Sequence, residues 1–193
     1  APNIFAISNA QQLSANQSIF EKEVNSFYAL ANVEFKNYAF LDLTYRSDIS
    51  STLPELSNQY DYFSAGLSAI ISDMVELPSA IDYFKLRASY AEVGNDTDPY
   101  QLSRAANLLT GGFIALSTSA PADNLRPEQT TSLELGFETT LFNRVNIDFT
   151  YYKSNSVDQL FRQNVPQGSG IATKFINGAD IENSGIEAAI NVG

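Results

Sequence analysis

Residues 132–152 read SLELGFETTLFNRVNIDFTYY and contain two runs of alternating side chains around a short break. Apolar side chains occupy every second position at Leu133, Leu135 and Phe137, and the run that starts at Val145 alternates in the same way through Tyr151. A period of two is typical of a β-strand with one apolar face. Phe142 and Asn143 predict a tight turn between the runs, because Asn tolerates the positive φ that such turns require. The stretch is therefore expected to form a β-hairpin.

The same alternation recurs along most of the chain, while helical periodicity is scarce. It predicts about seven strands. A second tight turn is expected at Lys36 and Asn37, which separate two alternating runs. The apolar faces of the expected strands start at Phe27, Ala39, Phe63, Phe84, Leu133, Val145 and Ile186.

Two features favour a membrane barrel over a soluble sheet. The apolar faces carry no charged side chain at their centres, whereas the opposite faces carry residues such as Asp42, Arg87 and Glu134. Charge is costly against lipid and is tolerated in a wet lumen. Tyr and Phe gather near the strand ends, as in interfacial girdles. We expect tight or modest connections to lie at one end (36–37, 72–82, 142–143) and longer polar loops at the other (47–59, 95–127, 164–173).

The fold class expected from these patterns is all-β, with antiparallel up-and-down strands that form part of a transmembrane β-barrel. A soluble β-sandwich that acts as a carbohydrate-binding or adhesion module is the main alternative, because its strands also alternate. A small self-contained outer-membrane barrel is a third, but an odd strand number weighs against it.

The composition excludes several classes of function. The chain has 193 residues, no Cys, no His, 22 acidic and 11 basic residues, and a net charge of −11. Thiol nucleophiles, Cys/His zinc sites and imidazole-dependent triads are absent. The acidic balance argues against nucleic-acid binding, which requires clustered Lys and Arg. We expect no enzyme activity, no metal and no cofactor.

The two ends of the sequence predict that the chain is part of a larger protein. No apolar run is long enough for a transmembrane helix, and the start lacks a signal-peptide pattern. The last residues still alternate as in a strand.

The long loops are the expected place for a ligand site. Asp96 and Asp98 open the longest loop, and their oxygens raise the alternative of a Ca²⁺ site, but the spacing of a calcium loop is missing and a turn explains them better. Carboxylates scattered on a barrel wall likewise do not make a glycosidase pair. Aromatic and amide side chains in loops can stack on and hydrogen-bond sugars or peptides. The candidate ligand-contacting residues are Tyr60, Tyr62, Asp96, Asp98, Tyr100, Asp123 and Asn124.

Several segments, taken together and in this order, resemble the SusC-like branch of the TonB-dependent outer-membrane receptors. They are YFKLRASY at 83–90 with VGN at 93–95, LRPEQTTSLELGF at 125–137, LFNR at 141–144, YYK at 151–153, DQL at 158–160 and NGADIENSGIE at 177–187. The resemblance implies that residues 25–193 are the C-terminal portion of the receptor barrel without its plug domain. Residues 1–24 would be an incomplete strand or loop that enters it.

The resemblance also implies a function for the intact protein. It would reside in the bacterial outer membrane and import oligosaccharides or other large nutrients, with energy supplied by the TonB complex. A SusD-like surface lipoprotein would be its partner, an oligosaccharide or peptide its ligand and the lipid bilayer its surroundings.

Overall fold

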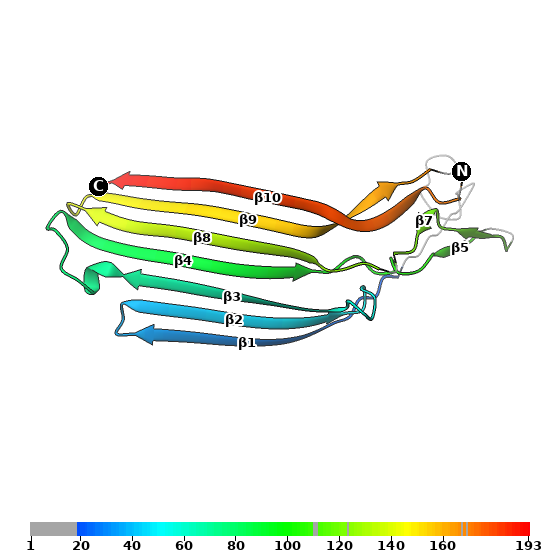
Figure 1. Ribbon diagram of the computed structural model, residues 1–193, viewed down its shortest axis with the longest axis horizontal. Coiled ribbons are helices and arrows are strands. Elements are labelled where there is room, and N and C mark those ends of the chain that lie inside the picture. The colour runs from blue at the N-terminus through cyan, green and yellow to red at the C-terminus, as the bar shows by residue number, and fades with distance from the viewer. Residues whose placement is uncertain (1–18, 110–111, 123, 167, 169) are drawn as a thin grey trace, which may run out of the picture.

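The computed structural model describes residues 19–193 except 110, 111, 123, 167 and 169, and it consists almost entirely of β-strands. Seven long strands form one sheet, with each strand antiparallel to the next along the chain (Figure 1). They are β1 (Val24–Phe35), β2 (Ala39–Ser50), β3 (Gln59–Ile70), β4 (Ile81–Asn95), β8 (Glu128–Leu141), β9 (Val145–Asn164) and β10 (Thr173–Val192). This confirms the all-β, up-and-down architecture expected from the sequence.

Short elements complete the structure. A 3-10 turn, η2 (Ile71–Asp73), follows β3, and β5 (Ala106–Leu108) pairs with β6 (Ile114–Leu116) in a small separate hairpin. β7 (Ser119–Ala120) runs parallel to the start of β10, which makes it the eighth strand of the large sheet. The sequence did not predict these three strands. They are too short to show an alternating pattern.

The expected tight turns are confirmed by the backbone. Lys36 and Asn37 have φ angles of 49° and 60°, and Phe142 and Asn143 have 53° and 52°. Two consecutive positive φ angles are the requirement of the type I′ hairpin turn, whose twist matches that of the flanking strands. The β1–β2 and β8–β9 hairpins therefore close as the sequence predicts.

The strand register separates the two faces of the sheet by polarity. Residues that are direct neighbours across the seven strands form rows, and two adjacent rows on one side contain only apolar or aromatic side chains. We call this side the apolar face: Val33, Leu41, Leu67, Ala88, Leu135, Tyr151 and Ile186 form one row, and Phe35, Ala39, Ala69, Leu86, Phe137, Phe149 and Ala188 form the other.

The opposite side, the polar face, carries the charges of the same region. Its two rows are Asn32, Asp42, Gly66, Ser89, Glu134, Tyr152 and Gly185, then Glu34, Phe40, Ser68, Arg87, Gly136, Thr150 and Glu187. A single sheet with lipid on one side and water on the other has this division. A β-sandwich needs a second sheet packed against the first. Within the described residues the large sheet has no such partner, and the soluble alternative is not supported.

Strand length agrees with a bilayer. β1, β2 and β3 have 12 residues each, close to the roughly 9–11 that a tilted membrane strand needs. β9 and β10 have 20 residues each and continue past the apolar rows. There an ion pair between Lys153 and Glu182 (3.0 Å) lies on the same side as the apolar face. We infer that this pair lies above the lipid.

Connections gather at the two ends of the sheet (Figure 1). Residues 36–38, 71–80 and 142–144 lie at one end, which we call the turn end; residues 51–58, 96–127 and 165–172 lie at the other, the loop end. The expected sorting by length is only partly right, because the connection 71–80 is longer than 51–58. β2 also runs to Ser50, past the expected start of its loop at residue 47, because Ser47, Asp48 and Ile49 still pair with β3.

No helix in the described part of the chain is long and apolar enough to cross a membrane. The buried hydrophobic residues of the described chain instead lie at the loop end. Leu53, Tyr60, Ala122 and Leu125 form a small core there, while both faces of the sheet remain open.

Candidate functional site

Two of the predicted site residues belong to this loop-end core. Tyr60 is buried, and Tyr62 packs against the core from the side. Their rings stack 6.1 Å apart at 16°. Gly94 on β4 makes the arrangement possible, because a Cβ at this position would overlap the Tyr60 ring. The stack is thus part of the packing that holds the loops on the sheet.

Asp48 holds the Tyr60–Tyr62 stack in place through a hydrogen bond from Tyr62. Its carboxylate accepts hydrogen bonds from Arg46 Nε (2.7 Å) and Tyr62 Oη (2.8 Å), and the residue is only 3% exposed. Burial by itself would raise the pKa of the Asp48 carboxyl, but hydrogen bonds from Arg46, Ser26 and Tyr62 hold the pKa below its ordinary value. Asp48 is therefore a structural anion. The sequence did not single it out, because an Asp at a strand end is common.

Asp96 connects three segments that are distant in sequence. The Ser50 hydroxyl donates to one carboxylate oxygen, and the Lys22 ammonium pairs with the other. The Asp96 side chain is 7% exposed, and Ser50 also shares a hydrogen bond of 2.9 Å with Thr52. Burial, with the nearby charges of Asp96 and Asp48, raises the pKa of Tyr60 to about 12. The segment before β1, the end of β2 and the 96–127 loop are thereby held together.

The remaining predicted residues lie apart from this core. Asp98 and Asn124 are exposed. Tyr100 is 53% exposed and has a φ of 65°. Asp123 lies outside the described residues. The structure therefore brings Tyr60, Tyr62 and Asp96 together and leaves Asp98, Tyr100 and Asn124 open to solvent.

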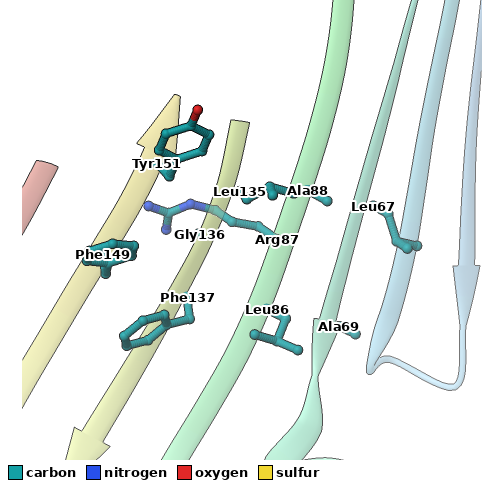
Figure 2. Close-up of a pocket in the computed structure, with 10 residues that line it drawn as sticks. All are labelled: Leu67, Ala69, Leu86, Arg87, Ala88, Leu135, Gly136, Phe137, Phe149 and Tyr151. Carbon is teal, nitrogen blue, oxygen red and sulfur yellow. The ribbon is translucent and has the colours of Figure 1, made fainter. Parts of the chain in front are cut away.

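The polar face holds a second organised group, which is centred on Arg87. Its guanidinium makes two hydrogen bonds to the Asp148 carboxylate (2.9 and 2.8 Å) and a third to the Thr150 hydroxyl (2.5 Å). To reach β9 from β4, the Arg87 side chain crosses β8 at Gly136 (Figure 2). A Cβ at Gly136 would lie 2.7 Å from Arg87 Nε and 2.8 Å from the Phe149 carbonyl oxygen. Glycine at position 136 therefore makes room for the Arg87 side chain.

Gly185 on β10 has the same kind of role. At Gly185 a Cβ would lie 2.6 Å from Tyr152 Oη, so glycine makes room for that ring on the polar face. The register of β10 shifts between Asn177 and Ala179, across Gly178, and again between Ala179 and Ile181, but it is regular at Gly185. The last strand is therefore irregular between Asn177 and Ile181.

A hollow of about 640 Å³ lies on the apolar face of the sheet (Figure 2). It forms where the small side chains of Ala69 and Ala88 lie among larger ones, Leu67, Leu86 and Phe137. Its almost wholly apolar lining offers nothing to orient a polar ligand. We interpret it as a hollow filled by lipid chains.

Within the described residues, no group of three or more acidic side chains lies close enough to hold a metal ion. The charged groups that are organised, Arg46 with Asp48 and Arg87 with Asp148, are ion pairs that fix strands and loops.

Comparison with known proteins decides the family. The family model described as "TonB dependent receptor-like, beta-barrel" matches residues 2–193. The chain belongs to the TonB-dependent receptor family. TonB-dependent receptor P3 of Formosa agariphila is 30% identical over 184 residues, covering 89% of this chain and 18% of that receptor. TonB-dependent receptor P26 of the same organism is 31% identical over 180 residues, covering 88% of this chain and 18% of that receptor.

Solved structures agree on the fold. The RagAB peptide importer in its "closed-closed" state matches with a TM-score of 0.82 at 21% identity, covering 98% of this chain and 22% of that one. The siderophore receptor PirA from Pseudomonas aeruginosa matches with a TM-score of 0.62 at 17% identity, covering 88% of this chain and 31% of that one. The chain thus spans about a fifth of the curated relatives it matches. It is part of an outer-membrane barrel, and the apolar face is the side toward lipid.

Proposed function

We propose that this chain is the C-terminal part of the barrel wall of a SusC-like receptor that imports large nutrients across the outer membrane. Residues 25–193 would supply the wall; of the expected lead-in, residues 1–18 lie outside the described residues. The observation that carries the proposal is the division of the sheet: the lipid-facing rows carry no charge, while the polar face carries Glu34, Asp42, Arg87, Glu134 and Glu187 toward a wet lumen. Such a wall tolerates passage of a polar cargo.

The cargo we propose is an oligosaccharide or a peptide. The loop end faces the cell exterior in this orientation, because outer-membrane barrels have short periplasmic turns and longer outer loops. Tyr100, Asp98 and Asn124 are exposed there, and aromatic and amide side chains suit both classes of cargo. Similarity to the RagAB peptide importer supports the peptide, and the SusC-like resemblance supports the oligosaccharide.

We further propose two partners for the intact receptor. TonB would supply the energy for import, as the family name implies. A SusD-like surface lipoprotein would cover the loop end and pass cargo to the lumen. The support for this second partner is the SusC-like sequence resemblance together with the fold match to RagAB.

Uptake by whole cells tests the proposal. The full-length receptor gene is deleted, and accumulation of fluorescent oligosaccharide and peptide pools is compared with that of wild-type cells and of cells treated with a protonophore. We expect deletion and protonophore to abolish accumulation of one pool and leave the other unchanged. Equal accumulation of both pools in wild-type, deletion and protonophore-treated cells would contradict import by this receptor.

A further inference from the structure

A polar cleft opens beside the Asp96 connection at the loop end. It has a volume of about 430 Å³ and lies between the segment that precedes β1 and the start of the 96–127 loop. Its lining residues are Glu21, Lys22, Glu23, Ser51, Pro99 and Tyr100. The cleft lies at the loop end, beside Ser51 and Glu23, whose backbones continue the β1–β2 ladder past Ser50 and Val24. Cargo that approaches the loop end would pass it.

Tyr100 presents its ring to this cleft from an unusual backbone conformation. Its φ of 65° is costly for a bulky side chain, so the surrounding contacts must hold it. The backbone N–H of Glu21 donates to Tyr100 Oη (3.1 Å), and the Phe20 ring lies 6.5 Å away. The Tyr100 side chain nevertheless stays 53% exposed. An exposed aromatic ring fixed in place at a cleft is a ready surface for stacking or for a cation.

The charge of the cleft favours binding of a cation to the Tyr100 ring over stacking of a neutral ligand. Lys22 is the one cation among the described lining residues, and the Asp96 carboxylate neutralises it. Glu21 and Glu23 therefore leave the cleft negative. Glu23 accepts a hydrogen bond from Asn25 Nδ2 (2.8 Å) through Oε1, and among the described residues none donates to Oε2. Carboxylates next to the face of an aromatic ring can bind an ammonium or guanidinium group, through charge-assisted hydrogen bonds and a cation–π contact.

We propose that this cleft binds a cationic group, the Lys or Arg side chain or the amino terminus of a peptide cargo, at the loop end of the sheet. The inference rests on the proposed import function and narrows its cargo. Tyr100 contributes the ring face, while Glu21 and Glu23 contribute the charge.

The test is calorimetric titration of the purified full-length receptor with tetralysine, tetraglycine and maltohexaose. Tyr100→Gly removes the ring and accepts the positive φ, while Tyr100→Phe keeps the ring. Glu21→Gln with Glu23→Gln removes the charge, and Glu55→Gln is the matched control, because Glu55 is an exposed carboxylate at the same end outside the cleft.

We expect tetralysine to bind and tetraglycine not to bind. The double Glu variant should weaken tetralysine binding about 5- to 10-fold, and Tyr100→Gly should weaken it about 3-fold. Tyr100→Phe keeps the ring but loses the hydroxyl that accepts from Glu21 N–H, so it should weaken binding less than Tyr100→Gly does. Glu55→Gln should leave binding unchanged. Equal tetralysine affinity in all variants overturns the proposal, and so does maltohexaose binding that needs Tyr100 but neither Glu. The titration does not require TonB, so a negative titration would overturn the cationic site without contradicting the proposed import. A negative uptake experiment would contradict import without changing the titration result.

Discussion

Replacing Gly136 by alanine tests the crossing of Arg87 over β8. The added methyl would lie 2.7 Å from Arg87 Nε and 2.8 Å from the Phe149 carbonyl oxygen. The arginine side chain can move, but the carbonyl belongs to the β8–β9 ladder and cannot move without disturbing it. Gly66 is the matched control, because it lies on the same polar face and its Cβ would come no closer than 3.8 Å to Asp42.

The size of the effect follows from two contributions. Overpacking typically costs about 1–3 kcal/mol. Displacement of Arg87 from Asp148 adds no more than about 1 kcal/mol, because the two side chains are 38% and 45% exposed and solvent screens the pair. Alanine lowers the conformational entropy of the unfolded chain equally at both positions, so this stabilising contribution cancels when the two variants are compared. We expect Gly136→Ala to be less stable than Gly66→Ala by about 1–4 kcal/mol.

Equilibrium urea unfolding of the full-length receptor, folded into phospholipid vesicles, measures this difference. Hydrogen exchange of β8 and β9 in the same samples shows whether the loss is local. We expect faster exchange in these strands for Gly136→Ala and unchanged exchange for Gly66→Ala. Equal unfolding midpoints and equal exchange in the two variants would refute the idea that Gly136 is required by the arginine crossing.

Three further predictions concern the loop-end core. Gly94→Ala should displace the buried Tyr60 ring and destabilise the loops by about 1–3 kcal/mol, seen as faster proteolysis of residues 96–127 in the folded receptor; unchanged cleavage would contradict it. The folded state keeps the Tyr60 phenol neutral. Its contribution to stability is therefore complete below its ordinary pKa of 10.0 and is lost as the pH rises through about 12. In an ultraviolet difference titration, the tyrosine that ionises at the highest pH should be missing from Tyr60→Phe. The folded state lowers the pKa of Asp48, so the contribution of this carboxylate to stability is present above its ordinary pKa of 3.8 and is lost as the pH falls through the lower folded value. Proteolysis of the loops should therefore depend less on acid pH in Asp48→Asn than in the unchanged receptor. An unchanged pH profile would contradict the role of the carboxylate.

The sheet was largely predictable because lipid imposes a strict rule on each strand. Every second residue from Leu133 or Val145 must be apolar, so the alternation is visible without any knowledge of partners. The turns were predictable for a similar local reason, the positive φ at Asn37 and Asn143. The ends of the strands were not, because the ladder of β2 continues through Ser47, Asp48 and Ile49 after the apolar pattern has ended.

The loop end was less predictable because its contacts join residues far apart in the chain. Lys22 pairs with Asp96 across 74 positions, and nothing local marks either residue for the other. Tyr60 and Tyr100 look alike in the sequence, yet one is buried against Gly94 and the other is held open to solvent. The Gly94 contact that distinguishes them is visible only once β3 and β4 are paired.

The central claim is that one face of this sheet meets lipid and the other meets water. The chain contains no cysteine, so single cysteines at 65–69 on β3 can be labelled with bimane in the full-length receptor, after replacement of any cysteines elsewhere. Nitroxide lipids should quench the probe at Ala65, Leu67 and Ala69, while aqueous iodide should quench it at Gly66 and Ser68. Quenching that does not alternate between successive positions would contradict the claim.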